Sequence, residues 1–147
     1  MEHTTDIIKQ FKTSYQNFSR DQVFKLLQLY SNDVVFTDPI HKLEGIDQLG
    51  HYFSSISANL TSCRFEFEDQ LIADESAYIK WVMFFRHPKL SKDVISVRGV
   101  THLMFDEKIY FHEDLYDLGS MLYDHIPLLG RGTRFLKSRL SRKNAKD

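Results

Sequence analysis

The spacing of apolar residues changes once along this 147-residue chain, and that change limits the possible folds more than any other feature. Up to about residue 60 the apolar residues recur at helical spacing. From Cys63 to Asp117 they alternate with polar residues, which is the pattern of half-buried strands. A block of helices followed by a block of strands predicts an α+β domain.

The two blocks predict three helices, one short strand and four long strands. The helices are expected at residues 4–18, 19–30 and 44–60, and "DVVFTDP" between the last two reads as a strand stopped by Pro39. The long strands are expected within 63–72, 76–87, 93–105 and 108–117, joined by short turns as an antiparallel meander. A curved sheet of such strands wrapped around the helices forms a cone whose open end is a pocket.

The chain length suits one domain large enough to enclose a small cavity. We expect a single domain over residues 1–130, with "LGSMLYDHIPLLG" as a short closing helix broken by Pro127, and a basic helix or tail over 131–147. No apolar run approaches the roughly 18 residues of a membrane span. The N-terminus shows no secretory signal. The single cysteine, Cys63, excludes an intrachain disulfide and a Cys-rich zinc site, and it agrees with a reducing cytoplasm. We expect a cytoplasmic protein without a metal site.

The formal net charge of −1 conceals an uneven distribution. Residues 131–147 carry seven of the 19 bases and one of the 20 acids, which leaves 12 bases against 19 acids, or about −7, in residues 1–130. An acidic body argues against nucleic acid as the main partner. The basic tail also carries leucines and a phenylalanine, so it could lie on an anionic membrane surface. We favour the alternative of a helix packed on its own domain.

The last predicted strand, "KIYFHEDLYD", carries an unusual set of side chains. Strand alternation places Tyr110, His112, Asp114 and Tyr116 on one face. We expect this face to be the inner one. The inner sets of the two preceding strands then include Trp81, Met83, Val97 and Thr101. The outer face would carry Val82, Phe84, Val100, Met104, Phe111 and Leu115, an apolar patch that predicts a homodimer through the sheet.

The order of these segments resembles the NTF2-like superfamily, and within it the SnoaL-like branch. The resemblance covers nearly the whole chain. Its most specific part is "FHEDLYDLGSMLYDHIPLLG", followed by the "LYSNDVVFTDP" and "EGIDQLGHYF" segments. The branch includes polyketide cyclases, ketosteroid isomerases and limonene-epoxide hydrolase. The resemblance implies a cone-shaped α+β roll with a ligand pocket inside the cone.

The resemblance also implies roles for individual residues. In limonene-epoxide hydrolase the carboxylate of the last strand falls on Asp114 here, and a water-positioning residue falls on Asp38. The Arg and second Asp that the hydrolase requires fall on Trp81 and Met83, so we expect no epoxide hydrolysis by that mechanism. In a SnoaL-type cyclase an acidic residue in the cone acts as general acid or base without a cofactor, and Asp114 is its counterpart. A ketosteroid-isomerase-like site would combine Asp38, Asp114 and a tyrosine.

The candidate catalytic residues are therefore Asp114, His112 and Asp38. A carboxylate in an apolar cone exchanges protons near neutral pH, and a histidine two residues away can tune it. The candidate ligand-binding residues are Trp81, Met83, Thr101, Tyr116, Tyr15 and His41. Each has a structural alternative: an ion pair for Asp114, an Asx turn for Asp38, a solvated loop for His41 and plain core packing for Trp81 and Met83.

Three functions remain open. The first is a cofactor-free enzyme that binds a small apolar, even lipid-like, molecule and catalyses isomerisation, cyclisation or hydration with Asp114. The second is a non-catalytic ligand carrier or sensor. The third is a dimeric module that binds other proteins. A pocket with an Asp/His pair serves the first two equally well.

Overall fold

The computed structural model describes residues 2–121 and 135–141, and it confirms the α+β class. Its helices are α1 (Glu2–Gln16), α2 (Arg20–Leu27), α3 (Ile46–Asn59) and α4 (Leu118–Met121). Its strands are β1 (Tyr30–Thr37), β2 (Lys42–Glu44), β3 (Ser62–Ile72), β4 (Ser76–Arg86), β5 (Ile95–Phe105) and β6 (Ile109–Tyr116). Residues 135–141 form a further helical segment. None of the helices in the described ranges is long and apolar enough to cross a bilayer.

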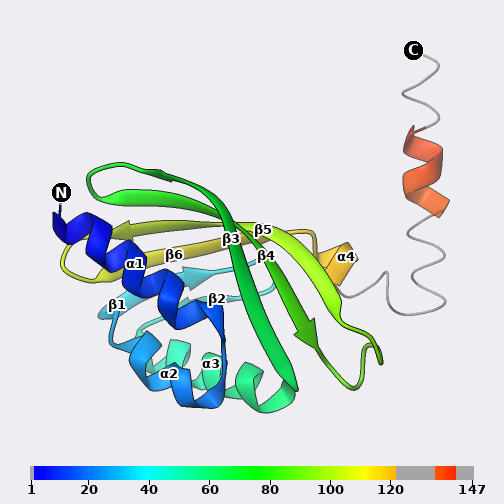
Figure 1. Ribbon diagram of the computed structural model, residues 1–147, viewed down its shortest axis with the longest axis horizontal. Coiled ribbons are helices and arrows are strands. Elements are labelled where there is room, and N and C mark those ends of the chain that lie inside the picture. Colours follow the sequence, from blue (N-terminus) through cyan, green and yellow to red (C-terminus); the bar gives the residue numbers. More distant parts are fainter. Residues whose placement is uncertain (1, 122–134, 142–147) are drawn as a thin grey trace.

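The six strands form one mixed, curved and unclosed sheet in the order β2-β1-β6-β5-β4-β3. Strands β3 to β6 form the predicted antiparallel meander. Strand β1 pairs in parallel with β6, the last strand of this meander, so the first and last strands of the chain lie side by side. The sheet curves around α1, α2 and α3, as Figure 1 shows.

The core lies between these helices and the inner face of the sheet. Helix α1 contributes Ile7, Ile8, Phe11 and Tyr15 at helical spacing, and α3 contributes Leu49 and Phe53. The inner faces predicted for β4 and β5 are confirmed, and their buried residues include Ile79, Trp81, Phe85, Ile95, Val97, Thr101 and Leu103. Each large apolar side chain buried in this way contributes about 1.5–3 kcal/mol to folding.

The predicted end of the second helix was wrong. Helix α2 ends at Leu27, and Tyr30 begins β1 instead of closing the helix. The reason is tertiary: the carbonyl of Leu29 accepts a hydrogen bond from the amide of Ile109 at 2.8 Å, which draws this segment into the sheet. The three-residue strand β2 was not predicted because it is too short to show a period.

The prediction that Tyr110 shares a face with His112 was also wrong. Met104 pairs with Phe111 and Phe105 pairs with Ile109, so Tyr110 is the extra residue of a β-bulge. Ile109 is fully buried in its place. Beyond the bulge the alternation holds, because His112, Asp114 and Tyr116 pair with inner residues of β5.

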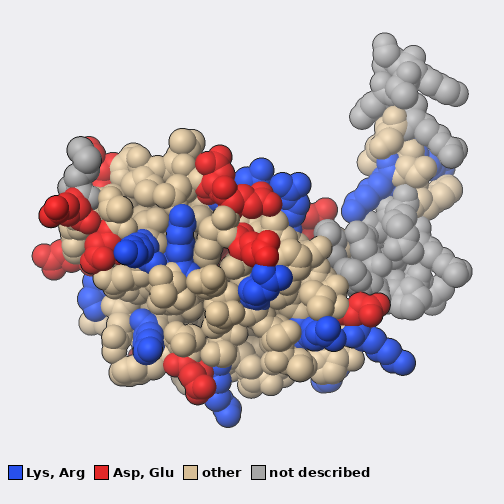
Figure 2. All heavy atoms as spheres, viewed as in Figure 1, with Lys and Arg blue, Asp and Glu red and all other residues tan. Residues whose placement is uncertain are grey.

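Helix α4 occupies the start of the predicted closing helix, and the rest of that segment, with Pro127, lies outside the described residues. In the tail, the described residues 135–141 are all exposed, including Phe135, Leu136 and Leu140. On the face of the molecule drawn in Figure 2, basic and acidic side chains are interspersed.

Candidate functional site

A cavity of about 350 Å³ opens between the inner face of the sheet and helix α3. Its walls come from β1, β3, β4, β6 and α3, with the loops after β1 and β4 at its rim. Most of the lining is apolar, and the apolar residues are Phe18, Phe36, Ile40, Phe53, Ile56, Leu60, Phe65, Trp81, Met83, Phe85 and Leu90. Its polar residues are Asp38, His41, Tyr52, Cys63, His87, Asp114 and Tyr116. This volume falls within the range of roughly 300–1,000 Å³ that is usual for small-molecule sites.

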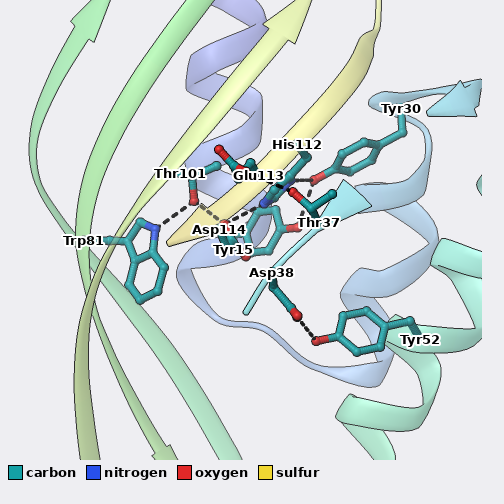
Figure 3. Close-up of polar contacts among 10 residues, drawn as sticks. All are labelled: Tyr15, Tyr30, Thr37, Asp38, Tyr52, Trp81, Thr101, His112, Glu113 and Asp114. Carbon is teal, nitrogen blue, oxygen red and sulfur yellow. Dashed lines mark hydrogen bonds and ion pairs between the residues drawn. The ribbon is translucent and has the colours of Figure 1, made fainter. Parts of the chain in front are cut away.

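Asp114 reaches the cavity from the centre of a buried hydrogen-bond chain, drawn in Figure 3. Its Oδ1 lies 2.7 Å from Nε2 of His112 and accepts a hydrogen bond from the Thr101 hydroxyl at 2.6 Å. The Trp81 indole donates to Oγ1 of Thr101 at 2.8 Å. Because an indole N–H can only donate, the hydroxyl proton of Thr101 is left for Asp114.

The chain continues behind His112, away from the cavity. Nδ1 of His112 lies 2.8 Å from the Tyr30 hydroxyl oxygen, which lies 2.9 Å from that of Tyr15. His112 is fully buried and stacks on Tyr30. Burial is the main cause that raises the pKa of both phenols, and the charge of Asp114 adds to it.

The two oxygens of Asp114 have different surroundings. Oδ1 accepts from both Thr101 and His112, whereas Oδ2 has no hydrogen-bond partner among the residues that the structure describes. The Asp114 side chain is 20% exposed, against 1% for His112, so Asp114 is the member of the pair that a ligand can reach. Within the described ranges, the site thus offers one carboxylate oxygen without a partner beside an apolar cavity.

Asp38 lines the same cavity, but both its oxygens have partners. Oδ1 accepts from the backbone amides of Ile40 and His41 at 2.8 and 2.6 Å, which is an Asx-type turn. Oδ2 accepts from the Tyr52 hydroxyl at 2.7 Å, and Nδ1 of His41 lies 3.2 Å from Oδ1. The Asp38 side chain is only 2% exposed. These contacts hold the loop after β1 in place.

Two further phenols border the cavity. Burial raises the pKa of Tyr52, and its hydrogen bond to Asp38 adds to the effect. Burial also raises the pKa of Tyr116, and the negative charges of Asp38 and Asp114 raise it further. Within the described part of the chain, the Tyr116 hydroxyl has no hydrogen-bond partner. Tyr116 therefore keeps a proton donor available beside Asp114, two residues along the same face of β6.

The structure brings most of the sequence-predicted site residues to this cavity. Asp114, Asp38, Trp81, Met83, Tyr116 and His41 line it. His112, Thr101 and Tyr15 do not: they belong to the chain of hydrogen bonds behind Asp114. Whether any of them binds a ligand or reacts with it stays a prediction.

Sequence reasoning missed Tyr52, His87 and Gly99. A Cβ atom on Gly99 would lie 2.4 Å from Cη2 of Trp81, so this glycine makes room for the indole. The register could have shown it, because Gly99 pairs directly with Trp81. Tyr52 carried no such signal, since its partner Asp38 lies outside its own helix. Among the described residues, no group of three His, Cys, Asp or Glu side chains could hold a metal ion.

Comparison with known proteins supports the same fold. A model of the SnoaL-like domain family matches residues 11–112, ending two residues before Asp114. A ketosteroid isomerase-like hypothetical protein from Catenulispora acidiphila, solved with trimethylamine, is 18% identical, with a TM-score of 0.69 over 80% of this chain and 89% of that chain. An NTF2-like protein of unknown function from Burkholderia pseudomallei is 15% identical, with a TM-score of 0.71 over 82% and 95%.

An LEH-like epoxide hydrolase from M. tuberculosis is 11% identical, with a TM-score of 0.67 over 94% of this chain and 97% of that chain. No curated protein matches the sequence. The family match covers most of the chain, and these solved structures share its curved sheet and helices. The chain belongs to the SnoaL-like domain family and has the NTF2-like fold.

Proposed function

We propose that the protein binds a small apolar molecule in the cavity and transfers a proton on it, with Asp114 as the general base and acid. The observation that carries the proposal is that Asp114 lines an apolar cavity of about 350 Å³ while its Oδ2 has no partner among the described residues. A carboxylate so placed is poorly solvated, and a C–H or O–H acid of a ligand can satisfy it.

The reaction needs no group beyond the chain and the ligand. Oδ2 of Asp114 takes a proton from a carbon next to a ligand carbonyl, and the electron pair of that C–H bond moves onto the carbonyl oxygen. The Tyr116 hydroxyl donates a hydrogen bond to this oxygen as its charge develops. If a C=C bond adjoins the enolate, return of the proton from Asp114 to the far end of the conjugated system completes an isomerisation. If the ligand carries a second carbonyl, attack of the enolate carbon on that carbonyl carbon moves its π pair onto oxygen, which takes the proton from Asp114 and completes a cyclisation.

The other lining residues have supporting roles in this proposal. Thr101 and His112 fix the orientation of the Asp114 carboxylate through Oδ1. Trp81 and Met83 give the cavity an apolar wall. Both stand where the resemblance to limonene-epoxide hydrolase places its Arg and second Asp, so epoxide hydrolysis by that mechanism is not proposed. Asp38 is assigned to holding the rim, since its lone pairs already accept several hydrogen bonds.

The test is solvent hydrogen exchange on candidate ligands. The protein is incubated in D₂O with a panel of small cyclic and aromatic ketones, and deuterium incorporation is followed by NMR. We expect Asp114→Asn to slow the exchange by about 10²–10⁴-fold, the usual contribution of a general base. Glu113→Gln is the matched control, because Glu113 is the neighbouring carboxylate of β6 and does not line the cavity.

Binding is measured separately through Trp81, the only tryptophan of the chain, whose ring lines the cavity. Asp114→Asn should leave the fluorescence titration of an active ketone within a few-fold of the wild type. Exchange at the wild-type rate in Asp114→Asn would refute the mechanism. Tight binding of ligands that never exchange would instead identify a non-catalytic carrier.

A further inference from the structure

The contact between His112 and Asp114 has two chemical interpretations. Nε2 of His112 and Oδ1 of Asp114 lie 2.7 Å apart, a distance that suits an ion pair with a charged imidazolium or a hydrogen bond from a neutral ring. The choice decides whether the charge of the carboxylate is cancelled from behind or remains available to a ligand. The hydrogen bonds on the other side of the ring distinguish the two.

The donors and acceptors behind His112 can be arranged in two directions. If the ring is neutral with its proton on Nε2, the Tyr15 hydroxyl donates to Tyr30, the Tyr30 hydroxyl donates to Nδ1, and Nε2–H donates to Asp114. Every polar hydrogen then has an acceptor. If the ring is charged, Nδ1–H donates to Tyr30 and Tyr30 donates to Tyr15.

The charged arrangement leaves the Tyr15 hydroxyl proton without an acceptor. Tyr15 is buried, and its hydroxyl bonds only to Tyr30 among the described residues. A buried donor without an acceptor is unfavourable because it has lost water without replacing it. The geometry therefore favours the neutral ring.

The groups around the ring agree with this choice. Helix α1 places Phe11 and Tyr15 against it, and β1 places Tyr30 and Phe36 there. Asp114 on β6 is the one ionised group bonded to the ring, and in the described residues no lysine or arginine contacts it. Thr101 on β5 acts only through Asp114, and Asp38 and Tyr52 bond to each other, apart from the ring, as Figure 3 shows.

We propose that Tyr30, oriented by Tyr15, is a positioning residue that holds His112 as the neutral tautomer with its proton on Nε2. His112 then orients Asp114 without cancelling its charge, and Oδ2, which has no partner among the described residues, stays available to a ligand. The consequence for catalysis rests on the proposed function, whereas the tautomer is a property of the free protein and is tested there.

The experiment is NMR of the ring nitrogens in protein labelled with ¹⁵N-histidine at pH 7, with His112 assigned by its loss in His112→Gln. The wild type should show one proton, on Nε2, and none on Nδ1. In Tyr30→Phe, Nδ1 loses its donor while Asp114 still accepts from Nε2–H, so we expect the Nδ1 resonance to move downfield, toward that of a ring nitrogen without a hydrogen bond. Tyr15→Phe should keep the wild-type tautomer, because Tyr30 still donates to Nδ1.

Tyr52→Phe is the matched control, since it removes a half-buried cavity phenol that bonds to Asp38 and not to His112. Protons on both nitrogens of wild-type His112 would overturn the proposal, and so would a Tyr30→Phe spectrum identical to the wild type. If Tyr30→Phe does not fold, the wild type still decides: a scalar coupling from the Tyr30 hydroxyl proton to Nδ1 is required, and its absence overturns the proposal. A failed ketone-exchange test would leave this result standing.

Discussion

Asp114 and Asp38 have the same side chain and line the same cavity, and their hydrogen-bond partners separate their roles. Asp38 accepts hydrogen bonds from two backbone amides and a phenol, so both oxygens of its carboxylate are engaged in holding the loop after β1. Oδ1 of Asp114 is hydrogen-bonded to Thr101 and His112, and Oδ2 has no partner among the described residues. The Asx turn predicted for Asp38 is present and the residue also lines the cavity, whereas its catalytic role stays a prediction.

Gly99 and Trp81 set the geometry of the same site. A Cβ on Gly99 would lie 2.5 Å from Cζ2 of Trp81 and 2.9 Å from the carbonyl oxygen of Leu115, so Gly99→Ala must displace the indole. We expect a loss of about 1–3 kcal/mol in the free energy of unfolding, typical of overpacking, and a red shift of the Trp81 emission. Urea denaturation and the emission spectrum measure both.

Gly50→Ala is the control for that substitution. The added Cβ would meet only the side chain of Leu27 at 3.3 Å, far from the indole, so Trp81 emission should be that of the wild type. If Gly99→Ala also left the emission and the stability unchanged, the tight packing of Trp81 on β5 would be refuted.

At the scale of elements, the hydrogen-bond chain joins segments that no local pattern connects. Tyr15 lies on α1, Tyr30 is the first residue of β1, and His112 lies on β6, 82 residues after Tyr30. The parallel pairing of β1 with β6 sets Phe36 opposite His112, which brings the loop that begins at Asp38 level with Asp114. The hydrogen-bond chain and the cavity wall thus both depend on the pairing of β1 with β6.

The buried phenols of these elements predict a stability that falls at high pH. Burial raises the pKa of Tyr15, Tyr30, Tyr52 and Tyr116 in the folded protein above the value of about 10 for an unfolded chain. The unfolded state therefore loses these protons first, so the stability present below pH 10 is lost as the pH rises further.

The expected slope is about 1.4 kcal/mol per pH unit for each such phenol above pH 10. Urea denaturation at pH 8, 9.5, 10.5 and 11 measures it, and Tyr52→Phe should make the slope shallower by one phenol. A free energy of unfolding that does not decrease between pH 9.5 and 11 would contradict the burial of these groups.

At the scale of the whole molecule, the outer face of the sheet carries exposed apolar side chains and has no assigned role. Tyr78, Met104 and Leu115 are exposed on it, and Tyr78 stacks on His102, whose ring contacts Phe111. The homodimer predicted from the sequence would cover this face, and it stays a prediction. We expect sedimentation analysis to show a dimer that Leu115→Lys converts into monomers.

Phe24→Lys provides the comparison for the dimer. Phe24 is 72% exposed, more than Leu115 at 53%, but it lies on α2 and not on the sheet. The substitution Phe24→Lys should therefore leave the dimer unchanged. A wild-type monomer at micromolar concentration, or equal dissociation by both substitutions, would rule out the sheet face as the interface.

The sequence by itself determined which faces of the strands point inward. Alternation places Trp81, Thr101, His112, Asp114 and Tyr116 toward the helices, and the structure has them there, because successive side chains of a strand point to opposite faces. The order of helices and strands likewise determined the fold class. Alternation failed at Tyr110, where a bulge adds a residue that no period reveals, and again in β3, where the register shifts between Phe67 and Asp69.

Only the tertiary structure decided which of these residues meet. Tyr30 was expected on a helix, and it reaches His112 because β1 pairs with a strand about 80 residues later. Such pairing depends on hydrogen bonds between distant backbones and on packing in three dimensions, which local periodicity does not contain. For the same reason the sequence pointed to Asp114, whereas only the structure shows that Oδ2 of this carboxylate has no partner in the part of the chain that is described.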